Sequence, residues 1–278
     1  MKVIDISADK SEMVEVVIGT PIHRTGAFVL DKFLLNQKEI QDKCPSSELV
    51  LATAENDFAG ELETLLASSG LRGKVLRYET VKPADARNRI WNITCGREAL
   101  RQYTLSQTGA RYMLFLDADM TCDPNIVEIM KREIRNCDVV YSGCPLRGVG
   151  IALAGTGCCM ITADTLREVK FKCIEFSNGH IMSEDQLLEF DLIKSGKRVK
   201  KGFFLTINHY VNAERAKSIE PRPVGLYRRI THFKYVRCAI ARTSIALHYD
   251  IGLWLLNLNW KLGRLMKSIL CFRRVNRH

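Results

Sequence analysis

Two aspartates, Asp117 and Asp119, stand two positions apart directly after the apolar run 112–116. Carboxylates without partners are costly to bury, so we expect this pair at the exposed end of a buried strand. Carboxylate oxygens suit Mg²⁺ or Mn²⁺, which usually shares its ligand shell with substrate phosphates. The competing interpretation is that one aspartate lies in a loop and the other caps the next helix. Asp123, directly before Pro124, is itself a predicted cap for that helix, which weakens this interpretation. The pair is short for a motif, but the strand before it strengthens the interpretation of a divalent cation that neutralises a diphosphate.

A second acidic pair, Glu184 and Asp185, follows Ser183 and precedes a helical pattern over 183–195. Acidic residues after a serine suit the first turn of a helix, because they complement the helix dipole and its free N–H groups. The same position also suits a general base that takes a proton from an acceptor hydroxyl. Both interpretations stay open on the residues alone.

The elements that would position these residues alternate along the first 140 residues. Strands are predicted at 14–18, 48–53, 74–78 and 111–116, with helices at 27–41, 61–69, 84–107 and 124–136. Such alternation predicts an α/β fold with a parallel sheet and helices on both faces. Ligands bind at the carboxyl ends of parallel strands, so the loops after residues 18, 53 and 116 are the expected site.

The second half of the chain is less regular. Strands are predicted at 138–142 and 158–161, a short helix at 164–169, and a strand or hairpin over 198–208. The small-residue segment 155–157 has no lysine and no following helix of a phosphate-binding loop.

The segment Ala86-Arg87-Asn88, the helix after it and the strand that ends in Asp117 and Asp119 resemble the GT-A-fold glycosyltransferases, especially family 2-like enzymes. The resemblance covers roughly residues 14–212. It implies a mostly parallel central sheet flanked by helices, and an Asp-x-Asp pair that holds a divalent cation against a nucleoside-diphosphate sugar. By this resemblance, Asp119 is the direct metal ligand and Asp117 contacts the nucleotide ribose or the metal.

The resemblance also assigns the second acidic pair. A Glu-Asp pair at a helix start, with a glycine some ten residues later, matches Glu184, Asp185 and Gly196. It implies inverting transfer with Asp185 as the general base and Glu184 as second choice. His209 lies where several GT-A enzymes supply a histidine to the metal, although a structural histidine beside a strand is the competing interpretation.

The donor-binding residues follow from the same resemblance. Thr20 and Pro21 would cradle the base, Arg24 would reach a phosphate, and Arg87 would bind phosphate or pair with a carboxylate. The second strand of the family normally ends in an acidic pair followed by Gly-Ser, whereas this chain has Ala54-Glu55-Asn56-Asp57. Glu55 is the candidate for the base contact, and this departure leaves the identity of the base open.

Charge is distributed unevenly, since residues 214–278 hold fourteen Lys or Arg and three Asp or Glu, while the whole chain carries +10. Apolar residues recur three to four apart over 251–275 between basic ones, which is typical of a helix at an anionic membrane surface. A helix packed on the domain is the alternative. We therefore divide the chain into a GT-A domain, 1–222, and a basic amphipathic helical extension, 223–278.

The compartment is predicted from what the sequence lacks. The first ten residues have no apolar signal region, and no window is long and apolar enough to span a membrane. The ten cysteines show no Cys-x-x-Cys spacing and are expected to be reduced. These features predict a cytoplasmic protein, peripheral on the inner membrane face if the extension binds lipid.

The sequence thus predicts a metal-dependent glycosyltransferase that uses Mn²⁺ or Mg²⁺ and a glycan or lipid-linked acceptor. One alternative is a sugar-phosphate nucleotidyltransferase, whose Gly-rich loop with Arg and Lys is poorly matched by residues 19–24. Another is a non-catalytic module that binds membrane or nucleic acid through its basic tail. Nucleic acid is not the expected partner, because no recognised motif supports it.

Overall fold

The computed structural model of the chain describes residues 14–82, 88–148, 150–175 and 181–231. Its first part alternates strands and helices: β1 (Val16–Pro21), the 3₁₀ helix η1 (Arg24–Val29), α1 (Leu30–Lys43), β2 (Ser47–Thr53), α2 (Asn56–Ser69), β3 (Gly73–Arg77), α3 (Arg89–Gln107) and β4 (Tyr112–Leu116). The predicted alternation is confirmed. Some helix starts differ: residues 24–29 form a separate 3₁₀ helix before α1, and α2 begins at Asn56 rather than at residue 61.

The second part adds shorter elements. They are β5 (Met120–Cys122), α4 (Ile126–Ile134), β6 (Val139–Ser142), β7 (Cys144–Pro145), β8 (Ile151–Ala152), β9 (Cys158–Thr162), α5 (Ala163–Glu168), β10 (Ile174–Glu175), β11 (Ile181–Met182), α6 (Glu184–Lys194), β12 (Val199–Gly202), β13 (Ile207–Tyr210) and β14 (Ala216–Ile219). The segment predicted as one strand or hairpin over 198–208 is instead β12 and β13, which lie in different sheets.

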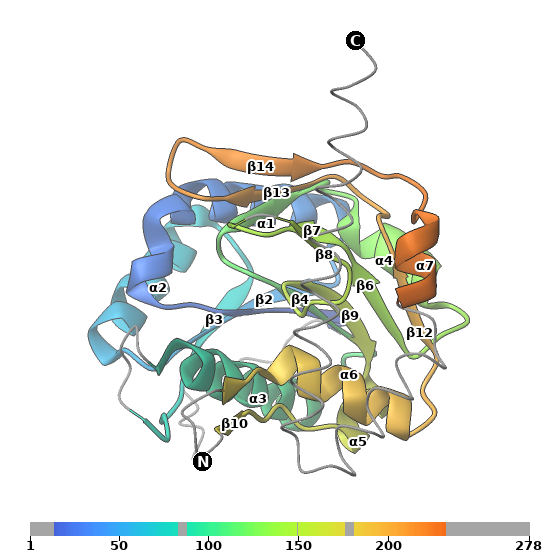
Figure 1. The fold of residues 1–278 in the computed structure, drawn as a ribbon. Helices are drawn as coiled ribbons and strands as arrows, with labels where there is room; N and C mark the ends of the chain where they lie inside the picture. The colour runs from blue at the N-terminus through green and yellow to red at the C-terminus, as the bar shows by residue number, and fades with distance from the viewer. Residues whose placement is uncertain (1–13, 83–87, 149, 176–180, 232–278) are drawn as a thin grey trace. The chain divides into compact units, whose positions relative to one another are not determined.

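A seven-stranded sheet in the order β12-β6-β9-β4-β1-β2-β3 forms the centre of the fold (Figure 1). Its neighbouring strands pair in parallel except β9, which runs antiparallel to both β4 and β6. The predicted mostly parallel sheet flanked by helices is confirmed. Because β4 lies between β1 and β9, the residues that follow it emerge at the middle of the sheet's carboxyl edge.

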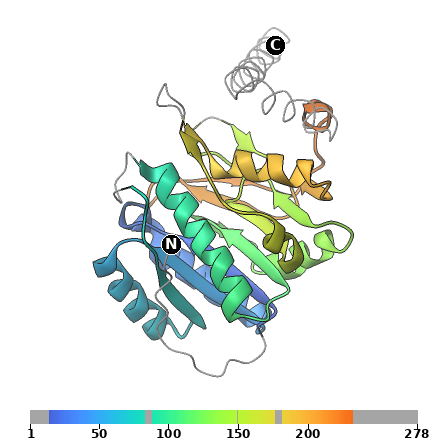
Figure 2. The same cartoon turned by 90° about the horizontal axis from the view of Figure 1, so that it is seen from below.

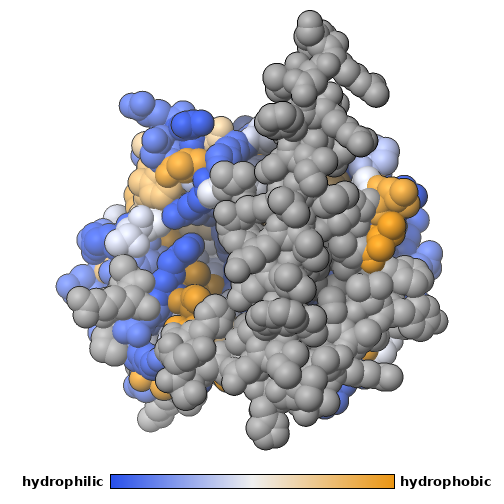
Figure 3. All heavy atoms as spheres, in the orientation of Figure 1, coloured by the Kyte–Doolittle hydropathy of each residue, from blue (hydrophilic) through white to orange (hydrophobic). Residues whose placement is uncertain are grey.

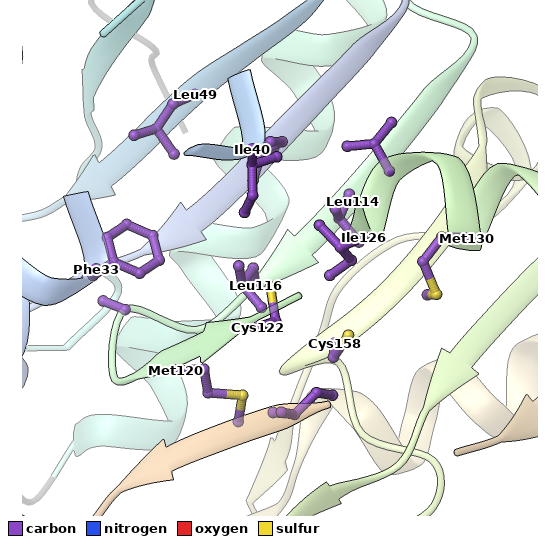
Figure 4. Close-up of a cluster of buried hydrophobic side chains, with 14 of the residues drawn as sticks. Phe33, Ile40, Leu49, Leu114, Leu116, Met120, Cys122, Ile126, Met130 and Cys158 are labelled. Atoms are coloured by element: carbon purple, nitrogen blue, oxygen red, sulfur yellow. The ribbon is translucent and has the colours of Figure 1, made fainter. Parts of the chain in front are cut away.

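Alternating side chains of the strands build two cores. Val16 and Ile18 of β1 face the side covered by α1, α2 and α4, while Val17 faces the side covered by α3, α5 and α6. Figure 4 shows the first core, where Phe33, Leu114 and Ile126 meet from a helix, a strand and another helix. Figure 2 shows α3 lying across the second face. The sheet is therefore buried on both sides and holds β4 rigidly.

A small antiparallel sheet, β14-β13-β5, lies against the end of β4 and was not predicted. Its strand β5 starts directly after Asp119, and β13 pairs with it so that His209 stands opposite Met120. A further hairpin joins β7 to β8. These strands are too short to show a periodic sequence pattern, so they could not be predicted. They determine the direction of the candidate functional side chains.

One predicted helix cap is wrong. Helix α4 begins at Ile126 with Asn125 as its N-cap, two residues after Asp123. Asp123 instead accepts hydrogen bonds at Oδ1 from the backbone N–H of Asn125 (2.8 Å) and from its side-chain amide (3.0 Å). Pro124 therefore lies in a turn stabilised by Asp123, which precedes the helix.

The chain divides into two compact units, residues 1–224 and 225–278. Of the second unit, the structure describes residues 225–231, which include helix α7 (Leu226–Thr231) with Leu226 and Ile230 exposed. The rest of the predicted helical extension lies outside the described residues and stays a prediction. In the described part of the chain, no helix is long and apolar enough to cross a membrane.

The face drawn in Figure 3 carries hydrophilic side chains over much of its left edge, with small apolar spots between them. Outside the second unit, the large apolar side chains described as exposed are Leu35, Val81 and Leu146. Scattered single residues of this kind are normal for a protein surface. Of the eight described cysteines, all free, only Cys137 is not buried.

Candidate active site

The two aspartates stand in the turn between β4 and β5. The backbone N–H of Asp117 donates to the carbonyl of Gly157 (3.1 Å), and its carbonyl accepts from the N–H of Met120 (3.1 Å). A Cβ atom at position 157 would lie 2.7 Å from Oδ2 of Asp117. Glycine is therefore needed at position 157 to leave room for the carboxylate.

His209 reaches Asp119 through the small sheet. Its Nε2 lies 3.1 Å from Oδ2 of Asp119, and its Nδ1 lies 2.6 Å from the carbonyl oxygen of Pro145. A carbonyl only accepts, so Nδ1 must carry a proton and Nε2 faces the carboxylate. Burial alone would lower the pKa of His209, but the hydrogen bond and charge of Asp119 raise it. The imidazole is thus oriented toward Asp119 by a backbone carbonyl.

Arg147, from the loop between β7 and β8, forms an ion pair with the same carboxylate oxygen, Oδ2 of Asp119. Its guanidinium also lies over the ring of Phe28, 5.4 Å from the centroid. Burial alone would raise the pKa of Asp119, and His209 and Arg147 together hold it below its usual value. Asp119 is therefore ionised and already faces positive charge.

Arg97 joins the two acidic pairs. Its Nη2 donates to Oδ1 of Asp117 (2.8 Å), and its Nη1 forms an ion pair with Glu184. The side chain of Arg97 is 5% exposed and that of Glu184 is 6% exposed. One guanidinium on α3 thus joins the turn after β4 to the start of α6, and it brings together carboxylates that lie far apart in the sequence.

The two carboxylates at the start of α6 have different surroundings. Burial raises the pKa of Glu184 to about 7, although Arg97 acts to lower it. Asp185 is half-buried, and its Oδ1 accepts from the hydroxyl of Ser183 and from the backbone N–H of Gln186 (2.8 Å). Ser183 is the N-cap residue as predicted, but its side chain makes no capping hydrogen bond.

A cavity of about 130 Å³ opens beside the aspartates at the carboxyl edge of the sheet. Its lining combines the loop after β1, the start of α3 and the turn after β4, including Pro21, His23, Tyr78, Asn92, Asp117, Asp119 and Arg147. Apolar surface with a few convergent polar groups is typical of a binding site for a small organic ligand. Gly96 leaves room for Tyr78, whose hydroxyl donates to the carbonyl of Asn92 (2.9 Å).

The residues predicted to bind the donor differ in their position relative to the cavity. Pro21 lines the cavity, whereas Thr20 is fully buried and donates to the carbonyl of Leu116 (2.7 Å), which fastens β1 to β4. Arg24 forms a two-pronged ion pair with Glu61 at 2.8 Å, and its backbone N–H donates to Glu55 (2.7 Å). Neither Arg24 nor Glu55 belongs to the described cavity lining. Arg87 lies outside the described residues.

The fold of this chain is similar to that of solved glycosyltransferase structures. The mannosyltransferase PcManGT from Pyrobaculum calidifontis, solved with GDP-Man and Mn²⁺, superposes with a TM-score of 0.51 over 88% of this chain and 67% of that chain, at 12% identity. The chain has the GT-A fold. No protein-family model matches the sequence, and no curated protein matches it.

Two other structures with the GT-A fold are similar at lower scores. S. aureus TarS 1–349 in complex with UDP-GlcNAc has a TM-score of 0.48 at 15% identity, covering 76% of this chain and 60% of that chain. A197 from STIV has a TM-score of 0.44 at 12% identity, covering 76% of this chain and 96% of that chain.

The residues of the candidate site differ in how well they would suit a divalent cation. Within the described residues, no three His, Cys, Asp or Glu side chains form a ready group of metal ligands. The structure does bring Asp119 and His209 together, and two neighbouring ligands of an octahedral Mg²⁺ ion lie about 3 Å apart when each bond is about 2.1 Å. Metal-bound histidines commonly donate their other N–H to a carbonyl, as His209 does. These two residues fit the cation, with Asp117 turned toward Arg97.

Two arginines of the candidate site, Arg97 and Arg147, were not predicted from the sequence. The sequence gives a weak indication of Arg97, because Arg97 and Arg101 stand four positions apart and so share one face of a helix. In the structure both side chains are buried. Charged residues in such positions need partners, and those partners are the candidates for a site. The sequence gives no indication of Arg147, because its position depends on the hairpin of β7 and β8, which was not predicted.

Proposed function

We propose that this protein is a glycosyltransferase that transfers a sugar from a nucleoside-diphosphate sugar to an acceptor hydroxyl with the help of a divalent cation. The observation that carries the proposal is the shared Arg97, which brings the Asp117 and Glu184 ends of the two acidic pairs to one site in a GT-A fold. PcManGT, which has this fold, was solved with GDP-Man and Mn²⁺. The cavity beside Asp117 and Asp119 is the proposed donor site.

In the proposed donor site, Asp119 and His209 would hold the cation and Asp117 would contact the nucleotide. When bound, the cation supplies positive charge that stabilises the leaving diphosphate. Asp117 suits a hydroxyl or ribose contact, because Arg97 fixes one of its oxygens and Gly157 leaves space beside the other. Pro21 and Tyr78 offer apolar surface to the base and ribose. The predicted contacts of Arg24, Glu55 and Arg87 stay predictions.

Asp185 is the proposed general base. Glu184 is buried and committed to Arg97, whereas Asp185 is half-buried and accepts its hydrogen bonds from described residues at Oδ1 alone. The other oxygen, Oδ2, would therefore face the acceptor. The acceptor oxygen attacks the anomeric carbon as its proton passes to Asp185, and the carbon–oxygen bond to the diphosphate breaks with its electron pair. Attack opposite the leaving group inverts the anomeric centre.

A turnover assay tests this mechanism. The protein is incubated with UDP- and GDP-sugars, Mn²⁺ and a panel of glycan and lipid-linked acceptors, and release of the nucleoside diphosphate is measured. Asp185→Asn is expected to lower kcat by about 10²- to 10⁴-fold, because a general base contributes about that factor. Donor affinity should stay within about twofold, since position 185 does not hold the donor.

The matched control is Asp164→Asn, which neutralises an exposed aspartate that pairs with Arg167 on α5. We expect full activity from this control. Absence of turnover with every donor, or equal turnover in the Asp185 and Asp164 variants, would remove the proposed mechanism.

A further inference from the structure

Two arginines touch the Asp-x-Asp pair, and they differ in their freedom to move. The side chain of Arg97 is 5% exposed and is pinned between Asp117 and Glu184. The side chain of Arg147 is 36% exposed, and among the described residues its carboxylate partner is Asp119. A change of ligand at this site can therefore reposition Arg147 at small cost, whereas moving Arg97 would strand two acidic groups.

The guanidinium of Arg147 competes for the proposed metal position. It contacts Oδ2 of Asp119, the oxygen that lies 3.1 Å from Nε2 of His209. A divalent cation held by those two atoms would repel the guanidinium beside the same oxygen. Arg147 and the cation therefore compete for the negative charge of Asp119.

The loop that carries Arg147 is held from outside the site. The ammonium of Lys217 on β14 donates to the carbonyl oxygens of Leu146 (3.1 Å) and Arg147 (2.6 Å), and also to that of Gly148. These bonds fix the backbone and leave the side chain of Arg147 free to turn. The ring of Phe28 supports the guanidinium on one side, 5.4 Å away.

We propose that Arg147 is a mobile internal cation of the donor site: it neutralises Asp119 when donor and metal are absent, and it turns to the donor's phosphate oxygens when the divalent cation takes its place. This proposal rests on the proposed function. Guanidinium groups recognise phosphate with two parallel hydrogen bonds, and Arg147 already lines the cavity next to Asp117 and Pro21. The charge at Asp119 is thus compensated in both states, while donor phosphates gain a second positive group.

The test measures two affinities with opposite expected changes. Free Mn²⁺ is followed by electron paramagnetic resonance in the absence of nucleotide, and nucleoside diphosphate binding is then followed by calorimetry at saturating Mn²⁺. Arg147→Gln is expected to bind Mn²⁺ about tenfold more tightly, because the competing charge is gone, and to bind the diphosphate about tenfold more weakly. Lys217→Gln releases the loop and is expected to change Mn²⁺ affinity in the same direction by a smaller factor.

The matched control is Arg132→Gln, which removes an exposed positive charge on α4 that pairs with Glu133. Equal Mn²⁺ affinity in the Arg147 and Arg132 variants would overturn the inference, even if sugar transfer is intact. Tighter Mn²⁺ binding by Arg147→Gln than by Arg132→Gln would support it, even if no donor is turned over. The two proposals can therefore fail separately.

Discussion

At the scale of single residues, Arg97 is the side chain on which the site depends most. It is buried between Asp117 and Glu184, and burial alone would lower its pKa, but the surrounding carboxylates raise it. It therefore stays charged and balances the two acidic pairs. A guanidinium can do this because its planar fork donates to two carboxylates at once.

The first prediction concerns stability. Arg97→Met leaves Asp117 and Glu184 without their shared partner, and breaking a buried pair in this way typically costs about 3–5 kcal/mol. We expect the free energy of unfolding, measured by urea denaturation at neutral pH, to fall by that amount. Arg132→Gln should change it by less than about 0.5 kcal/mol, as is usual at an exposed position. Equal stabilities of the two variants would show that Arg97 does not bridge the acidic pairs.

The second prediction concerns pH. The folded state raises the pKa of Glu184 to about 7 from 4.5, so folding favours its protonated form. Its contribution to stability is therefore greatest below pH 4.5 and is lost as the pH rises through about 7. In metal-free protein, the free energy of unfolding of the wild type relative to Glu184→Gln should fall between pH 5 and pH 8. Parallel pH curves for the two proteins would contradict this.

At the scale of elements, the long segments could be predicted from the sequence and the short ones could not. Strands such as β1 and β4 are continuous apolar runs, and α1 and α2 repeat apolar residues at helical spacing. The strand β5 has three residues, and the whole segment 123–206 separates it from its partner β13. The strand β5 forms because it pairs with β13, and a local sequence pattern cannot predict that pairing.

The candidate site follows the same division. Asp117 and Asp119 could be predicted, because their place after β4 follows from the sheet order. The approach of His209 to Asp119 could be proposed only from a family resemblance, because it requires the register between β5 and β13. The hydrogen bond from Thr20 to Leu116 could not be predicted, because the side chain of a strand-end threonine can face a neighbouring strand as well as a ligand.

The third prediction tests the turn that positions Asp117. Gly157→Ala would place a Cβ atom 2.7 Å from Oδ2 of Asp117 and displace the carboxylate. We expect the KM for the sugar nucleotide to rise about tenfold, because a shift of about 1 Å in a binding group has large effects. Gly155→Ala is the matched control, since its Cβ would meet Ala152 at an ordinary 3.6 Å. If the control raises KM as much as Gly157→Ala, the turn is not what positions the carboxylate.

At the scale of the whole molecule, charge separates the chain into two parts. Residues 1–213 are nearly neutral, while residues 214–278 carry the excess of Lys and Arg. A near-neutral domain with a basic extension suits an enzyme whose acceptor lies at an anionic surface.

The fourth prediction addresses that extension. Full-length protein should co-sediment with vesicles that contain anionic phospholipid and should stay in solution with neutral vesicles. Raising the salt concentration from about 0.1 M to 1 M should release it, because salt screens charges beyond about 3 Å at the higher concentration. Equal binding to anionic and neutral vesicles would contradict an electrostatic membrane contact.

We expect Asp119 to hold a divalent cation against a nucleoside-diphosphate donor at the end of β4, and calorimetric titration of the protein with UDP or GDP measures this binding. Wild-type protein should bind UDP or GDP when Mn²⁺ is present and lose that affinity when Mn²⁺ is chelated. Asp119→Asn should weaken the Mn²⁺-dependent binding by about 100-fold, the scale of losing a metal ligand or its support, whereas Asp164→Asn should leave it unchanged. Nucleotide binding that is independent of Mn²⁺ and equal in both variants would show that Asp119 holds no cation at the donor site.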